Sequence, residues 1–177
     1  RAFVSPTEIT QAGDSSYFLS GDKLWRNNVG LASEVTNVLG ESITGASSLI
    51  EVDNSLYFTR DTGAAGQLWR VEGIYAEQVG SDHTSVPTQL TPVGDSLYFI
   101  VPAASNDELW VPGATTPIST GGTVTGLTAT TDRVYFLVDG ALRSFDGSAI
   151  VDATSIVAGS QASLDSIVVG DRLNFLR

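Results

Sequence analysis

The sequence predicts an all-β fold, a small five-bladed β-propeller built from four-stranded blades of about 40 residues each. Three observations predict it. A Tyr-Phe signature occurs five times, at Tyr17, Tyr57, Tyr98, Tyr135 and the variant Asn174, with spacings of 40, 41, 37 and 39 residues. The strands carry large apolar groups on both faces, as blades covered on both sides require. No segment has apolar residues at helical spacing over three turns, so almost no helix is expected.

Each repeat begins with an inner strand that runs into a tight turn. We expect these strands at Thr7 to Ala12, Ser48 to Val52, Thr88 to Val93, Val124 to Ala129 and Leu164 to Val169. Turn pairs such as Gly13-Asp14 and Asp53-Asn54 follow them, because Gly, Asn and Asp tolerate positive φ. The Tyr-Phe strand comes directly after each turn and completes a hairpin.

A third and a fourth strand complete each repeat. The third is marked by a Leu-Trp pair in three repeats and is expected at Lys23 to Arg26, Gln67 to Arg70, Glu108 to Val111 and Ala141 to Phe145. The fourth is weaker and is expected around Glu34 to Val38, Ala76 to Val79, Thr116 to Ser119 and Ala149 to Asp152. The pattern therefore predicts one domain over residues 1–177, with repeats at about 7–45, 46–85, 86–122, 123–160 and 161–177, the last completed by residues 1–6.

The last repeat has only two strands, and a short apolar segment precedes the first repeat. Because an unpaired strand edge favours pairing with another strand, Arg1 to Ser5 is expected to pair beside Leu173 to Leu176 and close the ring. The same two segments would also allow pairing with a neighbouring molecule, which would produce filaments or swapped oligomers. Both alternatives remain open at the level of sequence.

The repeat resembles the E-L-W-x-x-D-G-T repeat of bacterial extracellular proteins. The segment from Leu56 to Trp69, with its Leu-Tyr-Phe and Leu-Trp pairs, follows that pattern closely, and Glu108-Leu109-Trp110 follows it in part. The sequence departs from it at Arg143, which stands where the other repeats have Trp, and in the missing D-G-T tail. The resemblance implies a β-propeller at the cell surface or in the extracellular space and says little about its ligand.

Composition excludes several classes of partner and cofactor. Twenty acidic residues against nine Lys and Arg give a net charge of −11, so neither nucleic acid nor insertion into a membrane is expected. The longest strongly apolar run, Leu97 to Ala104, is too short to span a bilayer. No Cys is present, and His83 is the single histidine, so no cofactor and no metal site are expected. The loops at Asp61 to Gly63 and Ser105 to Glu108 are interpreted as turns rather than calcium loops.

The candidate ligand-binding residues lie on the Leu-Trp strands: Trp25, Arg26, Trp69, Arg70 and Trp110. A repeated Trp offers a flat apolar face that stacks on sugar rings. The alternative is that the Leu-Trp pair is the packing unit between blades. Because the blades repeat, any such site is expected to repeat too, giving several weak equivalent sites for a neutral ligand.

A catalytic role for inner-strand carboxylates is the third possibility. Glu8, Glu51 and Asp165 lie on or near inner strands, as acidic groups do in glycosidases built on propellers. Other inner strands offer only Thr and Gln, so no catalytic residue is expected. The sequence thus predicts a non-enzymatic extracellular or cell-surface module for binding or adhesion, with glycans or other surface proteins as partners. The competing class is a structural subunit that assembles through Arg1 to Ser5 and the Leu173 to Leu176 edge.

Overall fold

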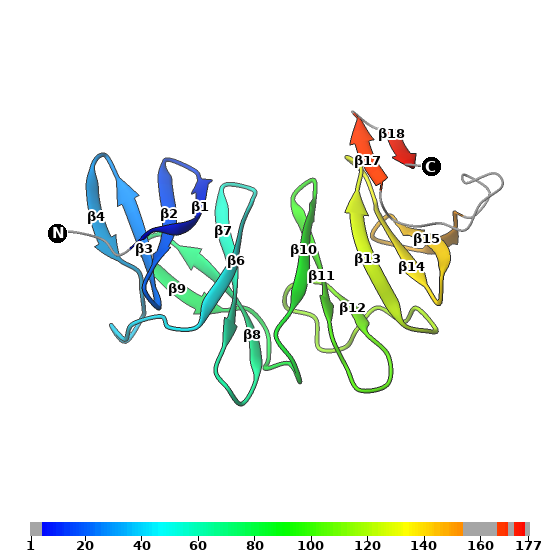
Figure 1. Ribbon diagram of the computed structural model, residues 1–177, viewed down its shortest axis with the longest axis horizontal. Helices are drawn as coiled ribbons and strands as arrows, with labels where there is room; N and C mark the ends of the chain where they lie inside the picture. Colours follow the sequence, from blue (N-terminus) through cyan, green and yellow to red (C-terminus); the bar gives the residue numbers. More distant parts are fainter. Residues whose placement is uncertain (1–4, 154–165, 170–171, 176–177) are drawn as a thin grey trace. The chain divides into compact units, whose positions relative to one another are not determined.

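The computed structural model describes residues 5–153, 166–169 and 172–175, with side chains for residues 5–153. The chain divides into two compact units, Arg1–Thr88 and Gln89–Arg177. All the regular structure of the described residues is β (Figure 1). No helix long and apolar enough to span a membrane occurs among the described residues. A single domain over the whole chain stays a prediction.

The first unit contains two sheets. The first sheet has four strands in sequence order, β1 (Thr7–Ala12), β2 (Ser15–Ser20), β3 (Lys23–Asn28) and β4 (Leu31–Glu34). The second has five strands in the order β5-β9-β8-β7-β6, formed by β5 (Thr36–Asn37), β6 (Ala46–Val52), β7 (Ser55–Asp61), β8 (Gly66–Glu72) and β9 (Tyr75–Gln78). Within these sheets all neighbours are antiparallel except β5, which adds to β9 in parallel. The first repeat thus contributes one strand to the sheet of the second.

The second unit contains three sheets. They are formed by β10 (Thr88–Val93), β11 (Ser96–Val101) and β12 (Glu108–Trp110), then by β13 (Val124–Ala129), β14 (Val134–Val138), β15 (Ala141–Phe145) and β16 (Ile150–Asp152), and last by β17 (Ser166–Val169) with β18 (Arg172–Phe175). Each sheet keeps its strands in sequence order. The sheets of the two units therefore have four, five, three, four and two strands, and the expected uniform four-stranded blade is found in the first and fourth repeats.

The inner strands, the Tyr-Phe strands and two of the four expected outer strands, β9 and β16, agree closely with the sequence prediction. The strand expected from Glu34 to Val38 is found only in part. β4 begins earlier, because Val29 and Gly30 both adopt positive φ and return the chain at once, and β5 occupies the middle of the expected segment. The strand expected from Thr116 to Ser119 is wrong. Ile118 makes only an isolated bridge to Leu109, because Pro112 and Pro117 supply no N–H to a ladder.

The inner strands share a backbone irregularity at one repeated position. Glu8, Ser48, Gln89 and Gly126 all have φ between 49° and 59°, and the strand register shifts at this position in β1, β6 and β13. A bulge of this kind bends the strand and turns side chains out of the ladder. Two of these side chains reach the next inner strand: Glu8 Oε2 accepts from Leu49 N–H at 3.1 Å, and Gln89 Oε1 accepts from Leu127 N–H at 2.7 Å.

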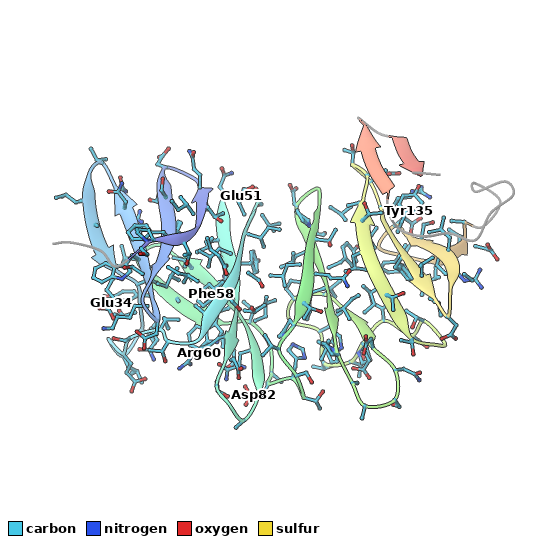
Figure 2. The ribbon with its side chains drawn as sticks, in the orientation of Figure 1. Glu34, Glu51, Phe58, Arg60, Asp82 and Tyr135 are labelled. Carbon is cyan, nitrogen blue, oxygen red and sulfur yellow. The ribbon has the colours of Figure 1, made fainter. Side chains whose placement is uncertain are left out.

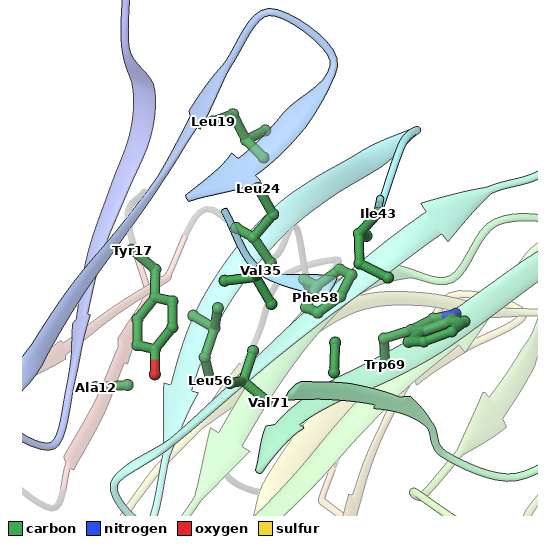
Figure 3. Packing of buried hydrophobic residues seen from close by; sticks show 11 residues of the cluster. Ala12, Tyr17, Leu19, Leu24, Val35, Ile43, Leu56, Phe58, Trp69 and Val71 are labelled. Carbon is green, nitrogen blue, oxygen red and sulfur yellow. The ribbon is translucent and has the colours of Figure 1, made fainter. Parts of the chain in front are cut away.

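Each unit has its own hydrophobic core, built from the two-sided strands. In the first unit Leu24, Leu56 and Phe58 are almost fully buried, and Tyr17 packs beside Ala12 and Leu56 (Figure 3). The second unit has a separate cluster around Phe136, Leu109 and Val124. Burial of large apolar side chains on both faces of a sheet is what a propeller-like arrangement of sheets needs. Of the predicted closing segments, Arg1 to Ser5 lies almost entirely outside the described residues, whereas most of Leu173 to Leu176 belongs to β18, so closure of the ring stays a prediction.

Candidate functional site

The repeated tryptophans lie mainly inside the protein. The Trp25 and Trp69 side chains are only 8% and 7% exposed, and Trp110 is half-buried. Phe58 stacks on Trp69 with ring centroids 6.3 Å apart, and the Arg60 guanidinium lies 5.3 Å from the centroid of the same indole; Phe58 and Arg60 are labelled in Figure 2. Little of these two ring faces is left for a sugar, which is the arrangement that the packing alternative describes.

The indole N–H groups have acceptors two residues earlier on the same strand. Trp69 Nε1 donates to Gln67 Oε1 at 2.9 Å, and Trp110 Nε1 donates to Glu108 Oε2 at 3.1 Å. Residues i and i+2 of a strand point to the same side, so a Glu or Gln at this position meets the indole directly. This explains why Gln or Glu precedes the Leu-Trp pair in these two repeats. The pair therefore works as a packing and hydrogen-bonding unit.

The two arginines of the predicted site lie together on an open groove in the first unit. The groove has a volume of about 320 Å³, at the small end of the range for ligand sites. The β1–β2 turn, β3, the β6–β7 turn, β8 and the β8–β9 turn form its walls, so both sheets of the unit contribute. Its polar side chains are Asp14, Ser15, Arg26, Asn28, Asn54, Ser55, Arg70 and Glu72. We call it the inter-sheet groove.

Arg26 is held in the inter-sheet groove by one hydrogen bond. Its Nε donates to Oγ of Ser15 at 2.8 Å, and Ser15 itself is buried at the start of β2. Among the described residues no acceptor meets its two terminal nitrogens. A guanidinium with a free fork binds carboxylates, sulfate esters and hydroxyl oxygens.

Arg70 is paired within the protein. Its terminal nitrogen donates to Glu72 at 2.7 Å and to Glu77 at 2.8 Å. The pKa of Arg70 is raised, chiefly by the hydrogen bond to Glu77 and, against the effect of burial, by Tyr57 and Glu72. The pKa of Glu77 is lowered mainly by the same bond. No acceptor among the described residues completes the geometry of a hydrogen bond with the buried Nε of Arg70. Arg70 thus lines the groove with a side chain that is held in place, and its charge is balanced by Glu72 and Glu77.

The arginines that line the groove are not repeated in the third and fourth repeats. The residue after the Leu-Trp position is Arg in the first two repeats, Val111 in the third and Ser144 in the fourth. Arg143, which replaces the Trp, is paired with Asp152 of the neighbouring strand β16. The expectation of several equivalent sites is therefore not met at this position among the described residues.

The inner-strand carboxylates act as hydrogen-bond acceptors for the backbone. Glu8 accepts from Leu49 N–H, and Glu51, labelled in Figure 2, accepts from Asn54 N–H at 2.6 Å. Asp165 lies outside the described residues. In the acidic loops Asp61 accepts from Gly63 N–H at 2.7 Å and Asp107 from Ala103 N–H at 3.2 Å, as expected of turns. Within the described part of the chain no group of three His, Cys, Asp or Glu side chains is placed to hold a metal ion.

The sequence analysis did not identify three polar residues that line the groove. Ser15 and Asn54 lie at the β1–β2 and β6–β7 turns, and Asn28 ends β3. They carried a signal, since turn pairs repeat at one end of each sheet, but turn chemistry explained them fully. Only the structure shows that the turns of two consecutive repeats meet at one hollow.

The comparisons agree with a β-propeller-like all-β fold. No family model matches the sequence, and no curated protein matches it. A catalytically inactive virginiamycin B lyase from Staphylococcus aureus, solved with quinupristin, is similar with a TM-score of 0.56 and 17% identity, over 86% of this chain and 56% of that one. A computationally designed protein is similar with a TM-score of 0.51 and 15% identity, over 80% of this chain and 45% of that one.

The β-propeller domain of the Trilobed protease from Pyrococcus furiosus matches with a TM-score of 0.38 and 10% identity, over 83% of this chain and 70% of that one. The chain spans about half the length of the lyase and of the designed protein. At these identities the similarity to them concerns the fold alone.

Proposed function

We propose that the chain is a non-enzymatic binding module of an extracellular or cell-surface protein, and that its ligand is a carbohydrate bound in the inter-sheet groove. One observation carries the proposal: two consecutive sheets bring Arg26, Asn28 and Asn54 to a single hollow of about 320 Å³. Carbohydrates are recognised by several fixed polar groups in a concave site, and Arg and Asn supply donors while Asn and Asp supply acceptors. The E-L-W-x-x-D-G-T resemblance supports the location and the family membership that we infer.

The same proposal includes the complete ring. Five repeats at a spacing near 40 residues and antiparallel sheets in sequence order support a five-bladed propeller closed by the N-terminal segment. Deleting residues 1–5 should then lower the melting temperature or cause aggregation, because it would expose a strand edge. An unchanged melting curve for the truncated protein would contradict closure by this segment.

Calorimetric titration against a panel of short oligosaccharides tests the binding function. We expect binding at one site per chain that the Asn54→Ala and Arg26→Ala variants weaken by about tenfold or more, which corresponds to loss of a hydrogen bond made by a charged or well-placed group. Arg133→Ala is the matched control, since this arginine pairs with Asp132 and is not among the residues that line the groove. No binding, or equal loss in all three variants, would contradict the proposal. Turnover of a glycoside would contradict the non-enzymatic part.

A second candidate function, assembly by strand addition, is favoured by one specific observation. Thr36 and Asn37 of β5 pair in parallel with Tyr75 and Ala76 of β9, so the second sheet already receives a strand from another repeat. In the first sheet, Leu31 of β4 takes the place that Tyr75 has in the second. It is strongly exposed, and no strand adjoins the outer side of β4 among the described residues. An edge of this kind accepts an extended segment of a second copy. Sedimentation over a range of concentrations tests it: assembly that Leu31→Lys abolishes supports it, and a monomer at all concentrations contradicts it.

A further inference from the structure

Among the described residues, almost every Lys and Arg side chain has a carboxylate or aromatic partner, which makes the exception informative. Six Lys and Arg side chains are described. Four pair with carboxylates, and a fifth lies over an indole face: Lys23 with Glu34, Arg70 with Glu72 and Glu77, Arg133 with Asp132, Arg143 with Asp152, and Arg60 on Trp69. Arg26 has neither kind of partner among the described residues and holds only the Ser15 hydroxyl. The exception lines the inter-sheet groove.

We propose that the ligand of the inter-sheet groove is an acidic sugar, a glycan residue whose carboxylate binds the guanidinium of Arg26. The inference rests on the proposed function and names its ligand class. With Nε engaged by Ser15, the two terminal nitrogens of Arg26 form a planar fork that matches the two oxygens of a carboxylate. The Ser15 bond fixes the rotation of the guanidinium, so less conformational entropy is lost when the ligand binds.

The remaining groove residues suit the hydroxyl groups of the same sugar. Asp14, Asn28 and Asn54 line the groove, and Asp14 has no hydrogen-bond or ion-pair partner among the described residues. A carboxylate accepts from sugar hydroxyls, and an amide both donates and accepts. Glu72 also lines the groove, but its charge is neutralised by Arg70. The groove thus offers one open cation beside several neutral or acceptor groups, which fits one acid group on a polyhydroxylated ring.

The net charge of the chain narrows the class of ligand further. At −11 the chain repels a long polyanion, so a polymer of uronic acids is disfavoured as a ligand at low salt. A neutral glycan with isolated acidic residues meets little repulsion and keeps the contact with Arg26. Because Val111 and Ser144 occupy the position of Arg26 in the third and fourth repeats, we expect one acidic-sugar site per chain.

The test compares three short oligosaccharides by calorimetry: a neutral trisaccharide, the same trisaccharide with a terminal glucuronate, and its monosulfated form. We expect the glucuronate form to bind at least about tenfold more tightly than the neutral one, and added salt to weaken that binding. Arg26→Gln should remove the difference, and Arg26→Lys should restore only part of it, since Lys lacks the fork. Arg133→Gln should leave it intact.

The Ser15→Ala variant tests whether Ser15 positions the guanidinium of Arg26 for the ligand, apart from any role in folding. It keeps the charge of Arg26 and removes the partner of Nε, so the affinity ratio between the glucuronate and the neutral trisaccharide should fall several-fold, which a loss of fold stability alone would not cause. Each variant is checked by its thermal unfolding curve. If Arg26→Gln unfolds below the assay temperature, Arg26→Lys and Ser15→Ala carry the test.

The outcomes distinguish the inference from the proposed function. Equal affinity for the neutral and glucuronate forms, both lost in Asn54→Ala, would overturn the acidic-sugar assignment and leave the groove a carbohydrate site. Tighter binding of the sulfated form would overturn the carboxylate as the recognised group. No binding of any of the three would overturn both the inference and the proposed function.

Discussion

Glu8 on β1 accepts a hydrogen bond from the N–H of Leu49 on β6, and so joins the inner strands of two consecutive sheets through a side chain. Gln89 does the same for Leu127 in the second unit, from the same repeated position of positive φ. Ser48 and Gly126 share that backbone conformation, but Ser48 has only a short side chain and Gly126 has none. The same position of the repeat therefore holds a residue that bonds to the next inner strand in two repeats, and a residue with a short side chain or none in two others.

The hydrogen bond between Glu8 and Leu49 predicts that two substitutions of Glu8 change the free energy of unfolding by different amounts. Glu8→Gln should keep the free energy of unfolding close to that of the natural sequence, because Gln89 shows that an amide oxygen serves as the acceptor. Glu8→Ala should lower it by about 0.5–1 kcal/mol, since the bond lies at the surface. Denaturant unfolding measures both. Equal destabilisation by Ala and Gln would contradict the prediction that an amide oxygen replaces the carboxylate as the acceptor of the Leu49 N–H.

The hydrogen bond between Trp110 and Glu108 predicts a second matched pair. Glu108→Gln should be nearly neutral, because Gln67 performs the same role for Trp69. Glu108→Ala should lower the free energy of unfolding by about 1–2 kcal/mol, because a half-buried indole N–H loses its acceptor. Chemical denaturation followed by tryptophan fluorescence is the measurement. An Ala variant as stable as the Gln variant would mean that the indole does not need the Glu or Gln that precedes Leu-Trp.

Val29 predicts a stabilising substitution. This valine is 95% exposed and has a φ of 50°, a conformation that costs a β-branched residue roughly 1–2 kcal/mol. Val29→Asn should therefore raise the free energy of unfolding by about 1 kcal/mol, since Asn tolerates positive φ. Val151→Asn is the control, because Val151 is exposed on β16 and its φ is not positive. A gain in both variants would point to a general effect of polarity rather than relief of strain.

Asp146 predicts a component of acid stability in the second unit. Its carboxylate accepts from the N–H of Ala149 and from the hydroxyl and N–H of Ser148, and these bonds lower its pKa to about 2, the Ala149 bond first. In the unfolded chain an Asp titrates near about 3.9. The stability that these bonds add is therefore fully present above that value and is lost as the pH falls through about 2.

The difference between the natural sequence and Asp146→Asn measures this component. The variant lacks the titrating group, so the difference in unfolding free energy between the two proteins should shrink on acidification from about pH 5 to about pH 2. An NMR titration of the Asp146 carboxyl should give the low pKa directly. A midpoint near the ordinary value of an Asp would contradict the role of these hydrogen bonds.

The inner strands were predictable because a turn pair closes each of them and a Tyr-Phe pair follows. The position of β1, β10 and β13 agrees with the sequence prediction to the residue. The outer strands of the first repeat were not predictable, because β4 is exposed and β5 has two residues, so neither has an apolar pattern. Their placement depends on the turn at Val29 and on the edge offered by β9.

The site was predictable only in part. Arg26 and Arg70 were singled out because they adjoin the repeated tryptophans, and they do line the groove. Whether a repeated Trp faces a ligand or a neighbouring strand depends on side chains from other strands, such as Phe58 and Arg60 on Trp69, which the spacing of the repeat does not contain. Stacking of ligand on the tryptophans remains a prediction.

The most direct test of the central claim is an NMR titration of the isotope-labelled protein with the glucuronate trisaccharide. If the inter-sheet groove is the binding site, the amide shifts of Gly13, Ser15, Ser55 and Gly73 change first and saturate together, and in Arg26→Gln the same shifts saturate only at about tenfold higher glycan concentration. Shifts centred on Trp110 or spread over the second unit would contradict the claim, as would a spectrum that the glycan leaves unchanged.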